Sequence, residues 1–157
     1  MQAYAAKLIN LIESKAENIA KQWAADVMKH NRTPSYHSLS KDLVVEQGVN
    51  FYRLFRQMSL AEVPYEEAKS FSWKYAEEFY QQKIPLHEAL YALILMRRHL
   101  WLYAEFQGTF VTALEKQQAV ESLNRTILMF DYVSYQVTEK YQQLTMEGVN
   151  KKLGIVK

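Results

Sequence analysis

Apolar residues recur at the spacing of an α-helix along almost the whole chain. In residues 3–30 this row is formed by Leu8, Leu11, Ile12, Ile19, Trp23 and Val27. In residues 41–58 it is formed by Leu43, Gln47, Phe51, Leu54 and Met58. Further rows follow within residues 64–79, 85–108 and 112–147, and no stretch alternates apolar and polar residues as a strand does. The pattern predicts an all-α domain of about five helices, globin-like or a helical bundle, with a long C-terminal helix.

Helix-breaking and capping residues mark the expected boundaries. Pro34 ends the first helix because proline cannot continue one, and Ser40 is placed to cap the second. Pro64 and Pro85 are expected at the start of the third and fourth helices. Gly48 lies inside the second helix, where glycine costs up to about 1 kcal/mol relative to alanine. We therefore expect two helices to cross closely at Gly48.

The composition fits one globular domain over residues 1–157. Hydrophobic residues make up 49% of the chain, and the four glycines and three prolines are too few for a sandwich or a doubly wound sheet. The net charge is +2 with both signs interspersed, which does not favour a nucleic-acid partner. No cysteine is present, which excludes disulfides and thiolate metal sites and fits a cytoplasmic protein. No signal peptide is visible, and the longest apolar stretch is far short of the ~20 residues of a membrane span, so no membrane partner is expected.

The fourth helix carries the densest apolar stretch. Residues 86–96 are apolar nearly all round, which indicates a helix in the middle of the domain. Arg97, Arg98 and His99 follow at once, and successive residues differ by about 100° around a helix. Arg97 shares a row with apolar residues, so we expect it to face the interior or a cleft. There it either pairs with an internal carboxylate or anchors an anionic small-molecule ligand.

The last helix carries a heptad pattern, here called the seam. It is formed by Val120, Leu123, Ile127, Phe130, Ser134, Val137, Tyr141 and Leu144. Steps that alternate between three and four residues allow helices to wrap around one another. The seam either packs on the core of its own domain or joins two copies in a homodimer. In the second case the interface residues are Ile127, Phe130, Val137 and Tyr141.

Four histidines raise the question of a metal or a cofactor. None of them has a second ligand at the spacing of a zinc or di-iron motif, so we expect no metal site. Heme needs only one axial histidine, and His99 is the candidate, with a satisfied interior histidine as the alternative. Neither His87 nor His99 precedes the lysine and glycine that follow the histidine of a phosphotransfer domain. The chain also lacks a catalytic cysteine, a Gly-x-Ser-x-Gly elbow and a phosphate-binding glycine loop, so we expect no catalytic residue and no cofactor.

Several segments together resemble one bacterial regulatory family. They are Trp23, the junction from Thr33 to Ser40 (TPSYHSLS), Ile84-Pro85-Leu86, the paired arginines at 97–98, and Phe130-Asp131 to Tyr141. In this order they resemble the N-terminal domain of RsbT co-antagonist proteins, which is related to the RsbR-type sensors of the stressosome. The resemblance covers about residues 16–144 and supplies no catalytic residues.

What the resemblance implies is a non-enzymatic input domain that senses a ligand or a partner and transmits the signal through its C-terminal helix. It also implies a dimeric, globin-like domain without heme, which works with an output signalling module or a partner protein. The chain ends without an output module, so it is either free-standing or the input end of a longer protein. Two alternatives stay open: a heme- or cofactor-binding globin-like sensor that uses His99, and a dimeric interaction scaffold without a small ligand.

Overall fold

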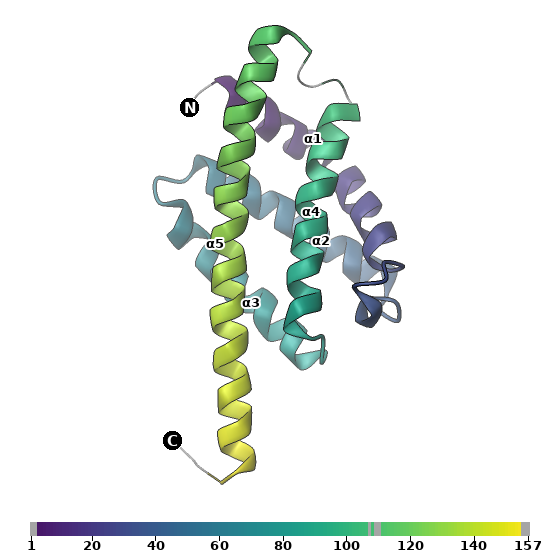
Figure 1. Cartoon of the computed structure of the whole chain (residues 1–157), viewed down its shortest axis with the longest axis vertical. Coiled ribbons are helices and arrows are strands. Elements are labelled where there is room, and N and C mark those ends of the chain that lie inside the picture. The colour runs from purple at the N-terminus through teal and green to yellow at the C-terminus, as the bar shows by residue number, and fades with distance from the viewer. Residues whose placement is uncertain (1–2, 107, 109–110, 155–157) are drawn as a thin grey trace.

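The computed structural model describes the backbone of residues 3–106, 108 and 111–154, and the side chains of residues 7–104, 108 and 111–154. Its elements are α1 (Ala3–Val27), a 3-10 turn η1 (Pro34–Tyr36), α2 (Lys41–Leu60), α3 (Pro64–Gln81), α4 (Leu86–Phe106) and α5 (Ala113–Lys152). The predicted all-α fold with a long C-terminal helix is confirmed. In Figure 1, α4 and α5 run side by side in opposite directions, and α1 and α2 cross behind them. Among the described residues, no helix has the length and apolar content needed to cross a membrane.

The helix ends follow the predicted stop signals, with two refinements. α1 ends at Val27 rather than near His30, and the Thr33 hydroxyl donates a 2.7 Å hydrogen bond to the buried carbonyl of Val27. Ser40 occupies the N-cap position of α2, but its side chain forms no capping hydrogen bond. By contrast, Thr112 caps α5 in a complete capping box with Glu115.

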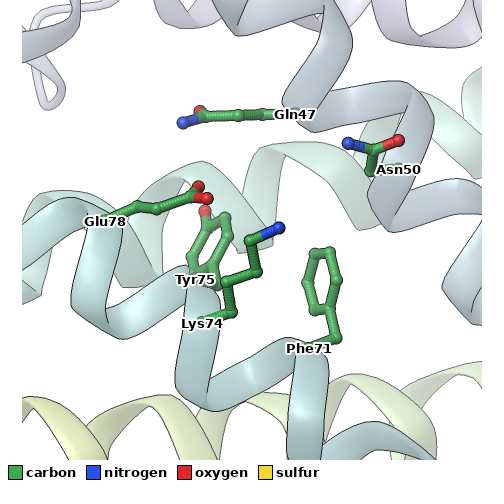
Figure 2. A pocket seen from close by; sticks show the side chains of 6 residues that line it. All are labelled: Gln47, Asn50, Phe71, Lys74, Tyr75 and Glu78. Atoms are coloured by element: carbon green, nitrogen blue, oxygen red, sulfur yellow. The ribbon is translucent and has the colours of Figure 1, made fainter.

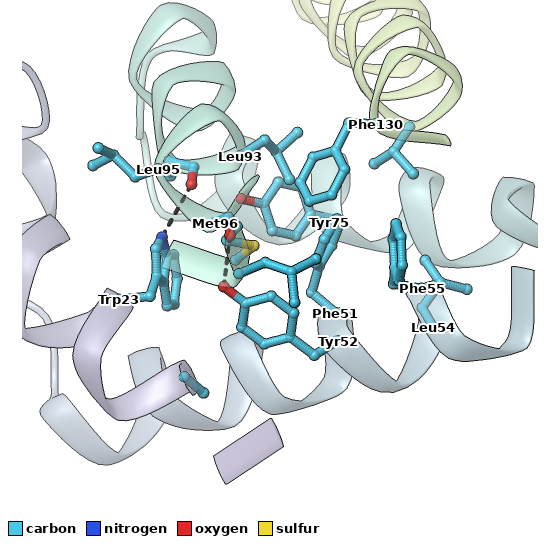
Figure 3. Close-up of a cluster of buried hydrophobic side chains, with 14 of the residues drawn as sticks. Trp23, Phe51, Tyr52, Leu54, Phe55, Tyr75, Leu93, Leu95, Met96 and Phe130 are labelled. Atoms are coloured by element: carbon cyan, nitrogen blue, oxygen red, sulfur yellow. Dashed lines mark hydrogen bonds between the residues drawn. The ribbon is translucent and has the colours of Figure 1, made fainter. Parts of the chain in front are cut away.

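Two aromatic side chains fasten α1 and α2 to the backbone of α4 (Figure 3). The indole Nε1 of Trp23 donates a 3.0 Å hydrogen bond to the carbonyl of Ala92. The Tyr52 hydroxyl donates one of 2.8 Å to the carbonyl of Met96. Both rings are fully buried, so each satisfies its own polar atom while it fills the core. These bonds give α4 its expected central position.

Gly48 makes the predicted close crossing possible. A methyl group added at Gly48 would lie 2.9 Å from Cε3 of Trp23 and 3.0 Å from Cβ of Ala20. Both atoms belong to α1 and lie within the packed interior. The prediction of a close helix–helix contact at Gly48 is confirmed, and glycine is needed there for space.

The long helix α5 is fixed to α3 and to the start of α4 by side chains near its middle. Gln136 donates a 2.7 Å hydrogen bond to the carbonyl of Tyr65 in α3. The Tyr141 hydroxyl donates one of 2.7 Å to the carbonyl of Ile84, just before α4. The Lys140 ammonium group forms an ion pair with Glu77 and also lies over the ring of Trp73. The α5 helix is therefore held both to α3 and to the segment just before α4.

Candidate ligand site between α2 and α3

The three consecutive basic residues of α4 point in different directions, as their spacing predicts. Arg98 is exposed and donates a 3.2 Å hydrogen bond to the Tyr91 hydroxyl. Arg97 is half-buried, and no acidic side chain among the described residues pairs with it. The expected internal salt bridge of Arg97 is therefore absent from this part of the structure. Arg97 lines none of four well-formed hollows on the described surface, so none of these four supports it as a ligand anchor.

His99 does not fit the role of a heme ligand. Its Nε2 atom lies 2.8 Å from Oδ2 of Asp26, which ties α4 to the end of α1. An axial ligand needs that nitrogen directed at the iron and an open pocket beside it. None of the four hollows is lined by His99. No three histidine, aspartate or glutamate side chains of the described chain gather into a possible metal site either.

The seam of α5 divides between the core and the surface. Phe130 and Val137 are buried inside one chain, at 4% and 0% exposure, so their prediction as interface residues is wrong. Both belong to the buried side of α5, which packs on the other helices of the same chain. Tyr141 is half-buried and bonded to the carbonyl of Ile84. Ile127 is exposed, together with Val120 and Leu123 before it.

The hollow of greatest chemical interest lies between α2 and α3 and is called here the α2–α3 pocket (Figure 2). Its volume is about 200 Å³. It is lined by Gln47, Asn50, Phe71, Lys74, Tyr75 and Glu78. The first two side chains come from successive turns of α2, and the other four come from three turns of α3. The pocket therefore depends on how these two helices are spaced.

Gln47 brings an unpaired amide to this pocket. The residue is only 7% exposed, and neither its Oε1 nor its Nε2 has a hydrogen-bond partner in the structure. Its row on α2 is otherwise apolar, with Phe51 fully inside the core. Buried polar side chains are nearly always hydrogen-bonded, and an unpaired one costs about 1–3 kcal/mol. An amide held unpaired at the wall of a hollow is suited to bind something that enters it.

The Tyr75 hydroxyl is the second unpaired polar group of the pocket. The ring is 3% exposed, and its oxygen has no partner that meets hydrogen-bond geometry, although the Tyr36 hydroxyl is close enough to affect it. Burial raises the pKa of Tyr75 strongly, the nearby Tyr36 hydroxyl lowers it in part, and the carboxylate of Glu78 raises it by a smaller amount. The hydroxyl therefore keeps its proton at neutral pH and can donate a hydrogen bond into the pocket.

The sequence carried one sign of this site. Gln47 is the polar member of an apolar row, which the helical pattern displays without explaining. Tyr75 and Phe71 belong to the apolar row predicted within residues 64–79, but nothing in the sequence shows that this row meets Gln47 across a hollow. Comparisons of the chain with family models, curated proteins and solved structures found no match. The resemblance to RsbT co-antagonist proteins and the globin-like topology stay predictions.

Proposed function

We propose that this protein is a non-enzymatic signal-input domain that binds a small molecule in the α2–α3 pocket. The observation that supports this most is the buried amide of Gln47, which has no hydrogen-bond partner in the part of the chain that the structure describes. A ligand that pairs with it would recover the free energy lost on its burial. Because the ligand supplies the hydrogen bonds that the amide lacks, its binding stabilises the folded domain. The proposed site therefore lies on α2 and α3 rather than at Arg97.

Aromatic contacts offer a physical connection from the pocket to α5. The ring of Phe71, which lines the pocket, lies 5.7 Å from that of Phe51. Phe51 in turn lies 5.1 Å from Phe130 of α5. Packed rings cannot move independently, because the interior has almost no free volume. We infer that a ligand that shifts Phe71 changes how α5 packs against the other helices. The far end of α5 would pass this change to an output module or a partner protein.

The test is the thermal unfolding of wild-type protein in the presence of a metabolite panel. A ligand at 100 times its Kd stabilises the folded state by about 2.7 kcal/mol. We expect at least one compound to raise Tm in the wild type and in Arg97→Ala, and to lose most of its effect in Gln47→Met. Gln57→Met is the control, since Gln57 is an exposed glutamine of the same helix outside the pocket. An equal shift in the wild type and Gln47→Met would contradict the pocket, and loss in Arg97→Ala alone would return the site to α4.

A second candidate function, a homodimeric scaffold, is favoured by a different observation. Val120, Leu123 and Ile127 are exposed apolar residues along α5. They continue the helical row of Tyr141, which reaches the start of α4, so they lie on the α4 side of α5. α4 and α5 run side by side at this face of the molecule. We propose this α4–α5 face as the contact between two copies.

Oligomeric state measured by sedimentation tests the scaffold. If the α4–α5 face joins two copies, Ile127→Glu should convert a dimer to a monomer while circular dichroism stays unchanged. Leu128→Glu is the control, because Leu128 is also exposed but points to the other side of α5. A monomeric wild type, or equal effects of both substitutions, would remove the scaffold hypothesis and leave ligand binding unaffected.

A further inference from the structure

The rim of the α2–α3 pocket carries one positive and one negative side chain. Lys74 and Glu78 lie one turn apart on α3, a spacing at which opposite charges can pair, although lysine before glutamate is the less favourable order. Among the described residues, no ion pair joins them and no other ion pair engages either side chain. Figure 2 shows why: the Glu78 carboxylate turns toward the Tyr75 hydroxyl, and the Lys74 ammonium turns toward Asn50 and Phe71. The pocket therefore has an anionic end and a cationic end.

We propose that the ligand of this pocket is a zwitterionic α-amino acid, an inference that rests on ligand binding as the proposed function. Its ammonium group would lie at the Glu78 end, and its carboxylate at the Lys74 end, where the Asn50 amide can also donate. Charged groups form the stronger hydrogen bonds in proteins. The two ends of the pocket match the two opposite charges of an α-amino acid, whose ammonium and carboxylate groups are both bonded to the α-carbon.

Gln47 completes this match because its amide contains both a donor and an acceptor. Oε1 can accept from an ammonium group, and Nε2 can donate to a carboxylate. Both atoms are unpaired, as a ligand with both kinds of group requires. A ligand with a single charge would leave one end of the pocket and one atom of Gln47 without a counterpart. The chemistry of the lining therefore favours a zwitterion over a simple acid or amine.

The size and the walls of the pocket restrict which amino-acid side chains can fit. A cavity of about 150 Å³ holds benzene, and this pocket has about 200 Å³. Phe71 and Tyr75 present aromatic rings that lie 5.8 Å apart with an interplanar angle of 25°. Apolar side chains gain from such walls, whereas acidic or basic ones would add an unmatched charge. We expect branched aliphatic amino acids to fit best.

The experiment measures binding by isothermal titration calorimetry with three probes that share one carbon skeleton. These are L-leucine, 4-methylpentanoate, which lacks the ammonium group, and 3-methylbutylamine, which lacks the carboxylate. We expect L-leucine to bind and each truncated probe to bind at least about tenfold more weakly, which is the effect of losing one charged hydrogen bond. Glu78→Gln should weaken L-leucine roughly tenfold, and Lys74→Gln by less, since Lys74 is exposed.

Two control variants separate the pocket charges from the overall charge of the protein. Lys69→Gln and Glu62→Gln remove the same charges from exposed positions outside the pocket, and both should bind L-leucine as the wild type does. Equal affinity for L-leucine and both truncated probes would overturn the zwitterion while leaving the pocket as a ligand site. Gln47-dependent binding of another class of compound would also overturn the zwitterion while leaving the pocket as a ligand site. Absence of any Gln47-dependent binding would overturn both the zwitterion and the proposed function.

Discussion

Replacing Gln47 with methionine should stabilise the free protein. Methionine has nearly the same length and helix propensity as glutamine, so the backbone of α2 gains or loses little. The substitution removes the two amide atoms that the structure leaves unpaired and keeps the contacts of the aliphatic stem. Stability should therefore rise at the same position where ligand binding is lost, a trade-off that functional sites often show.

The size of this effect follows from the environment of Gln47. A buried unpaired polar group costs about 1–3 kcal/mol. The pocket opens to solvent, and water can offset part of that cost. We expect a net gain of about 1–2 kcal/mol, or roughly 2–8 °C in Tm for a domain of this size.

Urea denaturation followed by circular dichroism measures the change, and Gln136→Met is the matched control. Gln136 is also buried, at 1% exposure against 7% for Gln47, and its Oε1 likewise has no hydrogen-bond partner among the described residues, but its Nε2 donates a 2.7 Å hydrogen bond to the carbonyl of Tyr65. Loss of that bond removes about 0.5–1.5 kcal/mol, so this variant should be less stable than Gln47→Met by at least about 1 kcal/mol. If Gln47→Met destabilises the protein as much as Gln136→Met, the amide of Gln47 is paired in solution and the reasoning for the pocket fails.

Three further predictions concern the fold itself. Gly48→Ala should lower stability by about 1–3 kcal/mol, because its methyl group would press against the rigid indole of Trp23; Gly148→Ala, where the methyl group meets only the end of a tyrosine side chain, should cost less in the same urea titration. Thr112→Ala should remove about 1 kcal/mol with the capping box, whereas Ser40→Ala should be nearly neutral, and equal effects would contradict the two cap geometries. Burial raises the pKa of three tyrosine hydroxyls above the ordinary value of 10.0. They belong to Tyr36, Tyr52 and Tyr75. Above about pH 10 the unfolded chain releases these protons while the folded chain keeps them, so stability should fall by up to about 1.4 kcal/mol per pH unit for each tyrosine. A urea midpoint that stays constant up to about pH 11 would contradict this.

Local sequence signals predicted the helices well because each signal acts within a few residues. The helical rows, Pro64 and Pro85 located the elements, and the interior glycine at position 48 located a crossing. These features depend on backbone geometry and on the side of a helix that is apolar. Neither requires knowledge of which helix lies opposite.

The functional surfaces could not be predicted in the same way because they depend on helix pairing. The seam of α5 is continuous in sequence, yet Phe130 faces the core while Ile127 reaches the surface. Arg97 shares a row with apolar residues of α4 and was therefore expected to face the interior, but its side chain is only half-buried. The pocket is formed between Gln47 on one helix and Tyr75 on another. A pattern along one segment of the chain carries no information on the distance between residues of two different helices.

The length of α5 has a mechanical consequence. A helix of 40 residues is a rod of about 60 Å at a rise of about 1.5 Å per residue. The lower end of this rod extends past α3 and α4 (Figure 1). A tilt of only about 5° around one end would move the other by about 5 Å, close to one full helical turn. A rearrangement of the helices that is small by the standards of side-chain packing would thus reach the far end of α5 as a displacement large enough to break or remake a contact there.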